Sequence, residues 1–252
     1  MVKITKSYKY ATAKQVIFQI RYSNLFMIGS KIGDIQLKLM KEFPKSSKVI
    51  KHNILFANIT PDTKIPSISD QPIGNTIWRF ESSSNYLLEI SSNTLSISST
   101  KYKSYQRDPD NSLREVIIEV MKVFLEYIPI LVFERIGLRY IDECPMPKDK
   151  NNFLKLYNST FPLSRFGLND AKEIAFFADV KREENYLRFG EKVKIIDGVE
   201  KLYLDFDGYA QDVNASDYLN VLDELHELIT EEYGNSIKDP IIKYMETGKL
   251  DE

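Results

Sequence analysis

This fold is constrained mainly by short segments in which apolar and polar side chains alternate. These segments precede long amphipathic helices. Alternation with period two is typical of strands. In the first half of the chain it predicts five strands, at residues 15–23, 53–59, 77–82, 86–91 and 94–100. The turns SSSN and SSN join the last three into a meander, and a helix at 30–43 that stops at Pro44 follows the first strand.

A strong helix closes this half of the chain. Ser112 and Glu115 have the spacing of a capping box, in which a Ser hydroxyl accepts a free backbone N–H and the Glu reaches back. Apolar residues then recur at helical spacing up to Ile128, and Pro129 ends the pattern. We therefore predict a helix over 112–128 with one buried stripe.

The second half repeats the scheme. Strands are predicted at residues 131–142, 174–180, 186–195 and 201–209, with a short helix at 151–156. A long helix capped by Asn214 or Ser216 follows, with apolar residues at helical spacing over 218–233, and Gly234 is expected to end it. Residues 236–252 are predicted to form a short helix and an acidic tail.

The two halves also resemble each other in residues. IFQIRY at 17–22 aligns with RIGLRY at 135–140, so that Arg21-Tyr22 corresponds to Arg139-Tyr140. We predict an α+β fold with two related β-α-β(3-4)-α halves, residues 1–129 and 130–252, with antiparallel meandering sheets and helices on one face. The element order is similar to that of TATA-binding-type and helix-grip folds. The halves form either one continuous sheet or two adjacent sheets, and they could pack as one compact domain.

Composition excludes several classes of site. With one cysteine, Cys144, there is no intramolecular disulfide and no multi-cysteine zinc site, and 10 Gly and 10 Pro leave little room for glycine-rich phosphate loops. Only two histidines are present. We therefore expect no cofactor. An apolar run long enough for a signal peptide or a membrane span is also lacking, so a cytoplasmic location is expected.

Charge is distributed unevenly although the net charge is only −2. Residues 1–64 hold 12 Lys and Arg against 3 Asp and Glu, whereas residues 197–252 hold 4 against 15. The two ends could neutralise each other, associate head to tail, or form two patches that bind partners of opposite charge. The pI of about 5.9 argues against a dedicated nucleic-acid binder.

Several stretches carry a resemblance to a known family. They are VIFQIRYS, WRF at 78–80 with the following LEISSNTLSISSTKYKSY, RIGLRYID at 135–142, LDFD at 204–207 and LDELHELITEEYGNSI at 222–237. In this order they resemble a sporadically distributed prokaryotic protein family of similar length and unassigned function, with IGLRYI as the most specific segment. The resemblance implies a soluble cytoplasmic protein and supplies no catalytic residues.

The candidate ligand-binding residues are the two matching Arg-Tyr pairs and a pair of aspartates. Planar guanidinium groups on Arg21 and Arg139 could bind a carboxylate or phosphate, or each could pair with a carboxylate across the sheet. The available carboxylates are those of Glu134, Glu143, Asp205 and Asp207. The full candidate set is Arg21, Tyr22, Arg139, Tyr140, Asp205 and Asp207.

Asp205 and Asp207 are two residues apart, so they share one strand face with Tyr203. Such a pair could hold Mg²⁺ or take part in acid–base chemistry, but a solvated strand face is the commoner case. His226 adjoins an apolar helix stripe and is expected to be packed and hydrogen-bonded. Cys144 has no basic neighbour in sequence that would make it a nucleophile.

These observations favour a non-enzymatic binding module that uses the concave sheet face or the groove between the halves. The partner is an unidentified protein or a small anionic ligand. A homodimer is plausible. Two alternatives stay open: an enzyme acting on an anionic small molecule, and a nucleic-acid binder that uses the basic first quarter or the aromatics of residues 78–105.

Overall fold

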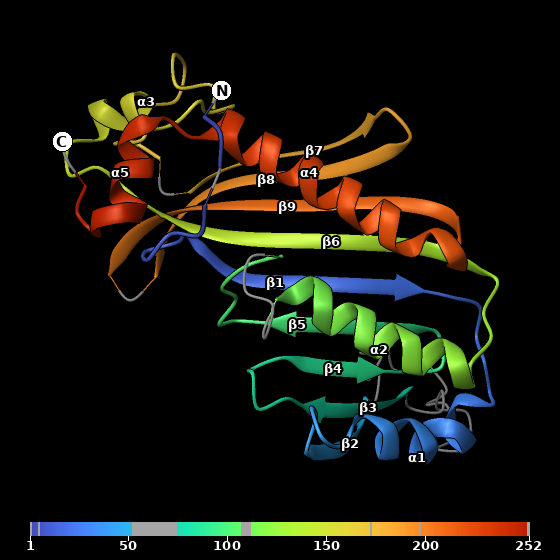
Figure 1. Cartoon of the computed structure of the whole chain (residues 1–252). Helices are drawn as coiled ribbons and strands as arrows, with labels where there is room; N and C mark the ends of the chain where they lie inside the picture. Colours follow the sequence, from blue (N-terminus) through green and yellow to red (C-terminus); the bar gives the residue numbers. More distant parts are fainter. Residues whose placement is uncertain are drawn as a thin grey trace, which may run out of the picture.

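A computed structural model describes residues 2–4, 6–51, 75–106, 112–171, 173–196 and 198–250 of the chain. These residues form an α+β structure with a single antiparallel sheet (Figure 1). Its strands are β1 (Ala13–Arg21), β2 (Lys45–Lys51), β3 (Asn75–Glu81), β4 (Leu87–Ile90), β5 (Thr94–Ser99), β6 (Val132–Pro145), β7 (Ile174–Arg182), β8 (Asn185–Ile196) and β9 (Val199–Asn214). The α-helices are α1 (Ile28–Leu39), α2 (Leu113–Tyr127), α3 (Phe153–Leu156), α4 (Tyr218–Ser236) and α5 (Asp239–Thr247).

The two strands that open the halves are neighbours at the centre of the sheet. The strand order is β2-β3-β4-β5-β1-β6-β9-β8-β7, so the sheet is continuous. In the β1–β6 ladder Gln19 lies opposite Gly137, Arg21 opposite Arg135 and Ile17 opposite Arg139. Of the two arrangements left open by the sequence, one continuous sheet is therefore the one observed.

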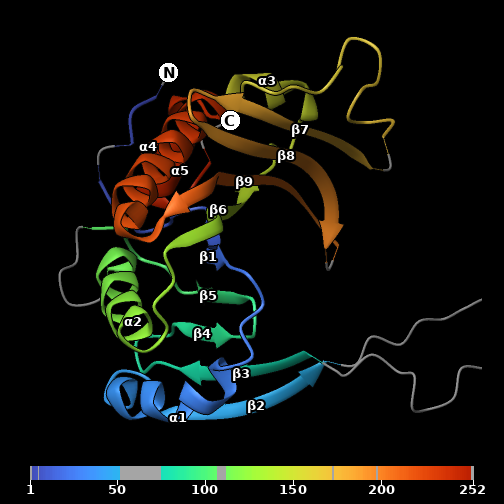
Figure 2. The ribbon, with the colours of Figure 1, turned by 90° about the vertical axis from the view of Figure 1, so that its right-hand side faces the viewer.

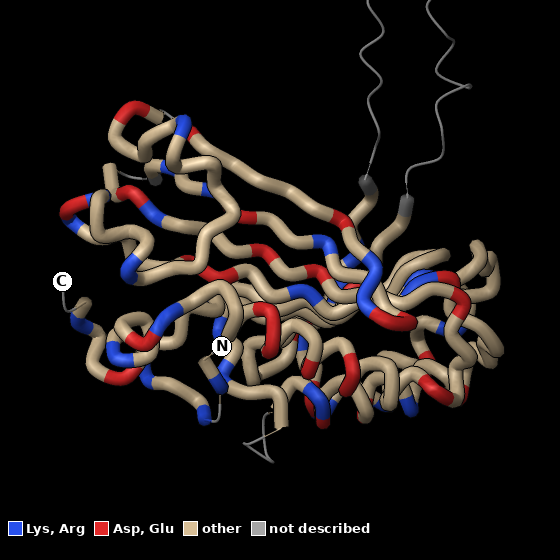
Figure 3. The backbone as a smooth tube through the Cα atoms, turned by 90° about the horizontal axis from the view of Figure 1, so that it is seen from above, with Lys and Arg blue, Asp and Glu red and all other residues tan. Residues whose placement is uncertain are grey.

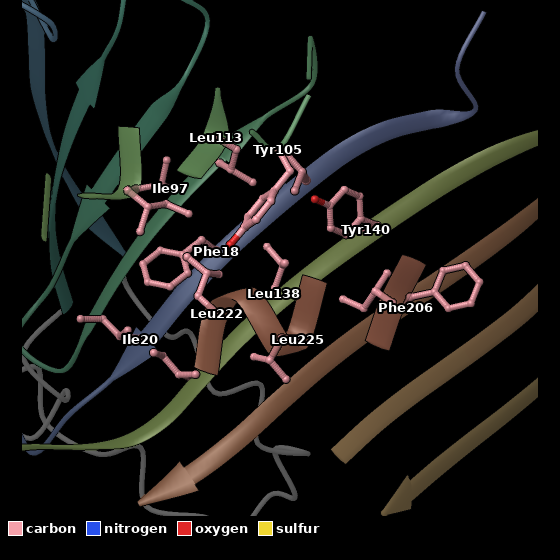
Figure 4. Packing of buried hydrophobic residues seen from close by; sticks show 14 of the residues in the cluster. Phe18, Ile20, Ile97, Tyr105, Leu113, Leu138, Tyr140, Phe206, Leu222 and Leu225 are labelled. Atoms are coloured by element: carbon pink, nitrogen blue, oxygen red, sulfur yellow. The ribbon is translucent and has the colours of Figure 1, made fainter. Parts of the chain in front are cut away.

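The long helices cover one face of this sheet, and the sheet curves away from them (Figures 1 and 2). Alternate residues of β1 point toward the helices and are fully buried, namely Val16, Phe18 and Ile20. They pack with Leu138 of β6 and with residues of α2 and α4 in the core drawn in Figure 4. Each such apolar side chain contributes roughly 1.5–3 kcal/mol by burial.

The predicted helix over 112–128 is confirmed together with its cap. Ser112 is extended and fully buried, and its hydroxyl accepts the backbone N–H of Glu115 at 3.3 Å. Among the described helices, none is long and apolar enough to cross a membrane.

Several predicted boundaries were wrong. A strand forms at Lys45–Lys51, where the sequence KSSKVIK is too polar to predict one, and within the described residues it pairs with β3 alone. The strand predicted at 53–59 lies outside the described residues. Helix α1 ends at Leu39, before Pro44. Gly234 does not end α4: it lies inside the helix, where a Cβ would clash with the Val2 carbonyl oxygen.

The start of α4 also differs from the prediction. Neither Asn214 nor Ser216 caps this helix, because a 3₁₀ turn over Ala215–Asp217 comes between β9 and Tyr218.

Candidate functional site

Among the described residues, no helix covers the sheet face opposite α2 and α4 (Figures 1 and 2), and this face carries the charged residues singled out in the sequence. The period-two pattern of β9 places Asp205 and Asp207 on this face with Tyr203, while Leu204 and Phe206 are buried under the helices. Ladder partners share a face, so Arg139 of β6, opposite Asp207, lies there too. Figure 3 shows positive and negative residues interspersed along these strands. We call this the open face.

Both aspartates are held by arginines of the neighbouring strand β6. Arg139 donates from Nε and Nη2 to the two carboxylate oxygens of Asp205, at 2.7 and 2.5 Å. Arg135 donates from Nη2 to Asp207 Oδ1 at 2.6 Å. The hydrogen bond to Asp205 raises the pKa of Arg139. Of the two roles considered for Arg139, pairing with a carboxylate across the sheet is the one observed.

Arg21 departs from that expectation. It is exposed at the end of β1, and its Nε donates to Gln19 Oε1 at 3.0 Å. Within the described part of the chain it has no acidic partner. The two matching arginines therefore have different environments, one paired and one available.

The two candidate tyrosines lie on the opposite side of the sheet, beneath the helices. Tyr22 is 1% exposed and donates to the Ser91 carbonyl at 3.0 Å. Tyr140 is also buried, and its hydroxyl lies 3.2 Å from His226 Nδ1. The six candidates thus do not form one site: Arg21, Arg139, Asp205 and Asp207 face the open side, and the tyrosines belong to the interior.

Tyrosines and a second ion pair extend the charged cluster toward β7. The Arg135 guanidinium lies over the Tyr209 ring, 4.7 Å from its centroid, and Tyr209 stacks on Tyr186 with centroids 5.1 Å apart. Tyr209 also donates to Asp179 at 3.0 Å, and Arg188 donates to the same carboxylate at 2.8 and 3.1 Å. These contacts join β6, β7, β8 and β9 into one polar network.

Two glycines let side chains lie flat on this surface. A Cβ at Gly137 would clash with the Arg135 guanidinium, and one at Gly190 would meet the Phe177 ring at 3.1 Å. Phe177 is 68% exposed in spite of this contact. The two glycines therefore leave room for the Arg135 guanidinium and the Phe177 ring to pack against the strands.

Sequence reasoning missed Arg135, Arg188, Tyr209 and Phe177. Arg135 shares the strand face of Arg139, four residues away, and this signal was available in RIGLRY. The other three lie on β7–β9, where strand pairing brings Tyr209 under Arg135, Arg188 beside Tyr209, and Phe177 against Gly190.

The other candidates lie beneath the helices. His226 is packed, with its ring stacked on Tyr105 at 3.9 Å between centroids. Cys144 is fully buried, and burial raises the pKa of its thiol well above the ordinary value, which opposes a nucleophilic role. No group of three or more His, Cys, Asp or Glu that could hold a metal ion occurs in the described ranges.

Comparison of the chain with protein-family models, with curated proteins and with solved structures returned no match.

Proposed function

We propose that this chain is a non-enzymatic binding module whose open face recognises a partner protein. The observation that carries the proposal is the cluster of Arg135, Arg139, Arg188, Tyr209 and Phe177 on the open face, which we call the Arg–Tyr patch. Arginine and aromatic side chains are enriched in protein–protein interfaces, and arginine and tyrosine among the residues that dominate binding energy. Their geometry here is already fixed by the contacts described above, so little conformational entropy is lost on binding.

The pairing of the charges favours a protein over a free anion. The guanidinium of Arg139 already binds both oxygens of Asp205, so a small carboxylate or phosphate would have to displace an internal partner. Arg135 and Arg188 are likewise neutralised by aspartates. A polyanion gains affinity from unpaired cations, whereas the three arginines of this patch are paired with aspartates. A protein surface can use the paired groups through hydrogen bonds and stacking.

We also propose that the two halves are an internal repeat with a two-fold axis between Gln19 and Gly137. An offset of 118 residues relates Arg21 to Arg139, as the sequence alignment requires. The same axis must then relate Arg135 to Ile17, and the ladder supports this because Arg21–Arg135 and Ile17–Arg139 are both opposed pairs. Outward from this centre the strands follow as β1-β5 in the first half and β6-β9 in the second. This order is consistent with a TATA-binding-like saddle.

If the proposal is correct, a partner should contact the chain at Phe177 in the cell. A photo-cross-linking residue, p-benzoylphenylalanine, is introduced at Phe177 and, as a control, at Leu37 of α1, which is similarly exposed at 69%. We propose that the partner is a cytoplasmic protein. Cross-linked adducts are identified by mass spectrometry. We expect a protein adduct at Phe177 and none at Leu37.

The recovered partner then provides the quantitative test. Phe177→Ala should weaken its binding to the purified chain at least tenfold, and Leu37→Ala should leave it unchanged. Absence of an adduct at Phe177, or equal adducts at both positions, would contradict the proposal. An adduct between two copies of the chain would assign the open face to a homodimer instead.

A further inference from the structure

A separate cavity lies on the helix side of the sheet, away from the open face. It has a volume of about 220 Å³ and is bounded by the N-terminal segment, the residues after β5, the buried side of β6 and helix α4. Figure 4 shows Tyr105 and Tyr140 where the core borders this region. The residues used below are Thr12, Tyr102, Ser104, Tyr140, Asp142 and His226, all of which line the cavity.

One polar group of the cavity is unsatisfied. Ser104 is 6% exposed, and its hydroxyl has no hydrogen-bond partner among the residues that the structure describes. Buried polar atoms are nearly always paired, because desolvation without a hydrogen bond is costly. Ser104 lines the cavity, so an occupant that reaches this hydroxyl would satisfy it.

The other polar groups are organised in two chains on the wall. Thr12 donates to Asp142 Oδ1 at 2.7 Å, and the Thr12 hydroxyl lies 2.6 Å from that of Tyr233. The Tyr140 hydroxyl lies 3.2 Å from both the Tyr102 hydroxyl and His226 Nδ1. Thr12, Asp142 and Tyr140 are each at least nine-tenths buried. Hydrogen bonding holds these groups in place before a ligand arrives.

Aromatic rings make up much of the remaining wall. Tyr102 meets Tyr140 edge to face at 5.4 Å, and Tyr105 stacks on His226. The position of Tyr105 is fixed by its 2.6 Å hydrogen bond to Asp223, which Arg114 also binds. Rings in such arrangements accept another ring by offset or edge-to-face contact.

We propose that this cavity binds a small aromatic compound of one or two rings that carries hydrogen-bonding groups. The volume of about 220 Å³ lies below the range of drug-sized ligands, so we limit the proposal to one or two rings. An aromatic body would replace weakly held water along the mainly apolar wall, and its polar group would pair with Ser104. This site is independent of the open face, so either proposal can fail without the other.

The test uses the full purified chain and three probes, indole, 4-hydroxybenzoate and adenine, by isothermal titration calorimetry. We expect at least one probe to bind with a Kd below about 1 mM. Ser104→Ala should weaken that binding about five- to tenfold, the effect of one hydrogen bond. The same variant should not lower the Tm of the free protein, because the hydroxyl has no partner to lose.

Ser99→Ala is the matched control. Ser99 is also buried, at 3% exposed, but its Oγ accepts the Lys101 N–H at 3.1 Å. This control should lower the Tm and leave the probe affinity unchanged. Absence of binding by all three probes would assign the cavity to ordered water and overturn the proposal, as would binding that Ser104→Ala does not weaken.

Discussion

Replacing Asp142 with Asn should stabilise the protein above neutral pH and change how its stability depends on pH. Asp142 is 5% exposed on the helix-facing side of β6. Burial raises the pKa of its carboxyl to about 7, with the nearby charge of Asp205 adding to the shift and the hydrogen bond from Thr12 opposing it. Tyr140, Tyr233 and Cys144 also interact electrostatically with Asp142, and burial keeps all three neutral at this pH.

The magnitude follows from the shift. An unfolded Asp titrates near 3.9, so the folded pKa is about three units higher, and each unit corresponds to about 1.4 kcal/mol. Between about pH 4 and pH 7 the unfolded chain has lost this proton and the folded protein retains it. Its contribution to the free energy of unfolding therefore falls by about 4 kcal/mol as pH rises through this window, and is constant above it.

Urea denaturation of the wild type and of Asp142→Asn, at pH 4.5, 6 and 8, measures this directly. The Asn side chain still accepts a hydrogen bond from Thr12 but has no charge to bury. The free energy of unfolding of the variant, minus that of the wild type, should therefore rise by several kcal/mol from pH 4.5 to pH 8. Asp212→Asn, which removes a carboxylate at an exposed position, is the control. Parallel pH profiles for wild type and Asp142→Asn would refute the reasoning.

Three further predictions concern the open face and a helix cap. Asp207→Ala should lower the free energy of unfolding, measured in urea, by about 2–3 kcal/mol, because Arg135 is only 14% exposed and loses its carboxylate. Asp205→Ala should lower it by about 1 kcal/mol, because the partner arginine, Arg139, is 41% exposed. Equal losses would contradict the argument. Gly137→Ala should displace Arg135, so the double variant with Asp207→Ala should lose less stability than the sum of the two single losses, and strict additivity would show that the two do not act through the same guanidinium. Ser112→Ala should lower the free energy of unfolding by about 1 kcal/mol through loss of the α2 cap, and an unchanged urea midpoint would show that the cap contributes nothing.

The local structure was largely predictable from residue spacing. Period-two alternation located β1, β6 and the strands of both meanders, and it placed Asp205 and Asp207 on a common face. The Ser112 cap and the stripe of α2 followed in the same way. These features depend on residues that lie close together in the sequence, so neighbouring residues determine them.

Tertiary structure decided which of these elements meet. The pairing of Arg139 with Asp205 joins residues 66 positions apart, and it exists because β6 and β9 are adjacent strands in one register. The cavity likewise needs the N-terminal segment, β6 and α4 to converge around Ser104. Gly234 was predicted to end a helix, but it lies inside α4 and packs against the Val2 backbone, a contact that the local sequence does not reveal. Side-chain periodicity sets the face on which a residue lies, whereas its partner is set by long-range strand pairing and core packing, which leave no mark in local spacing.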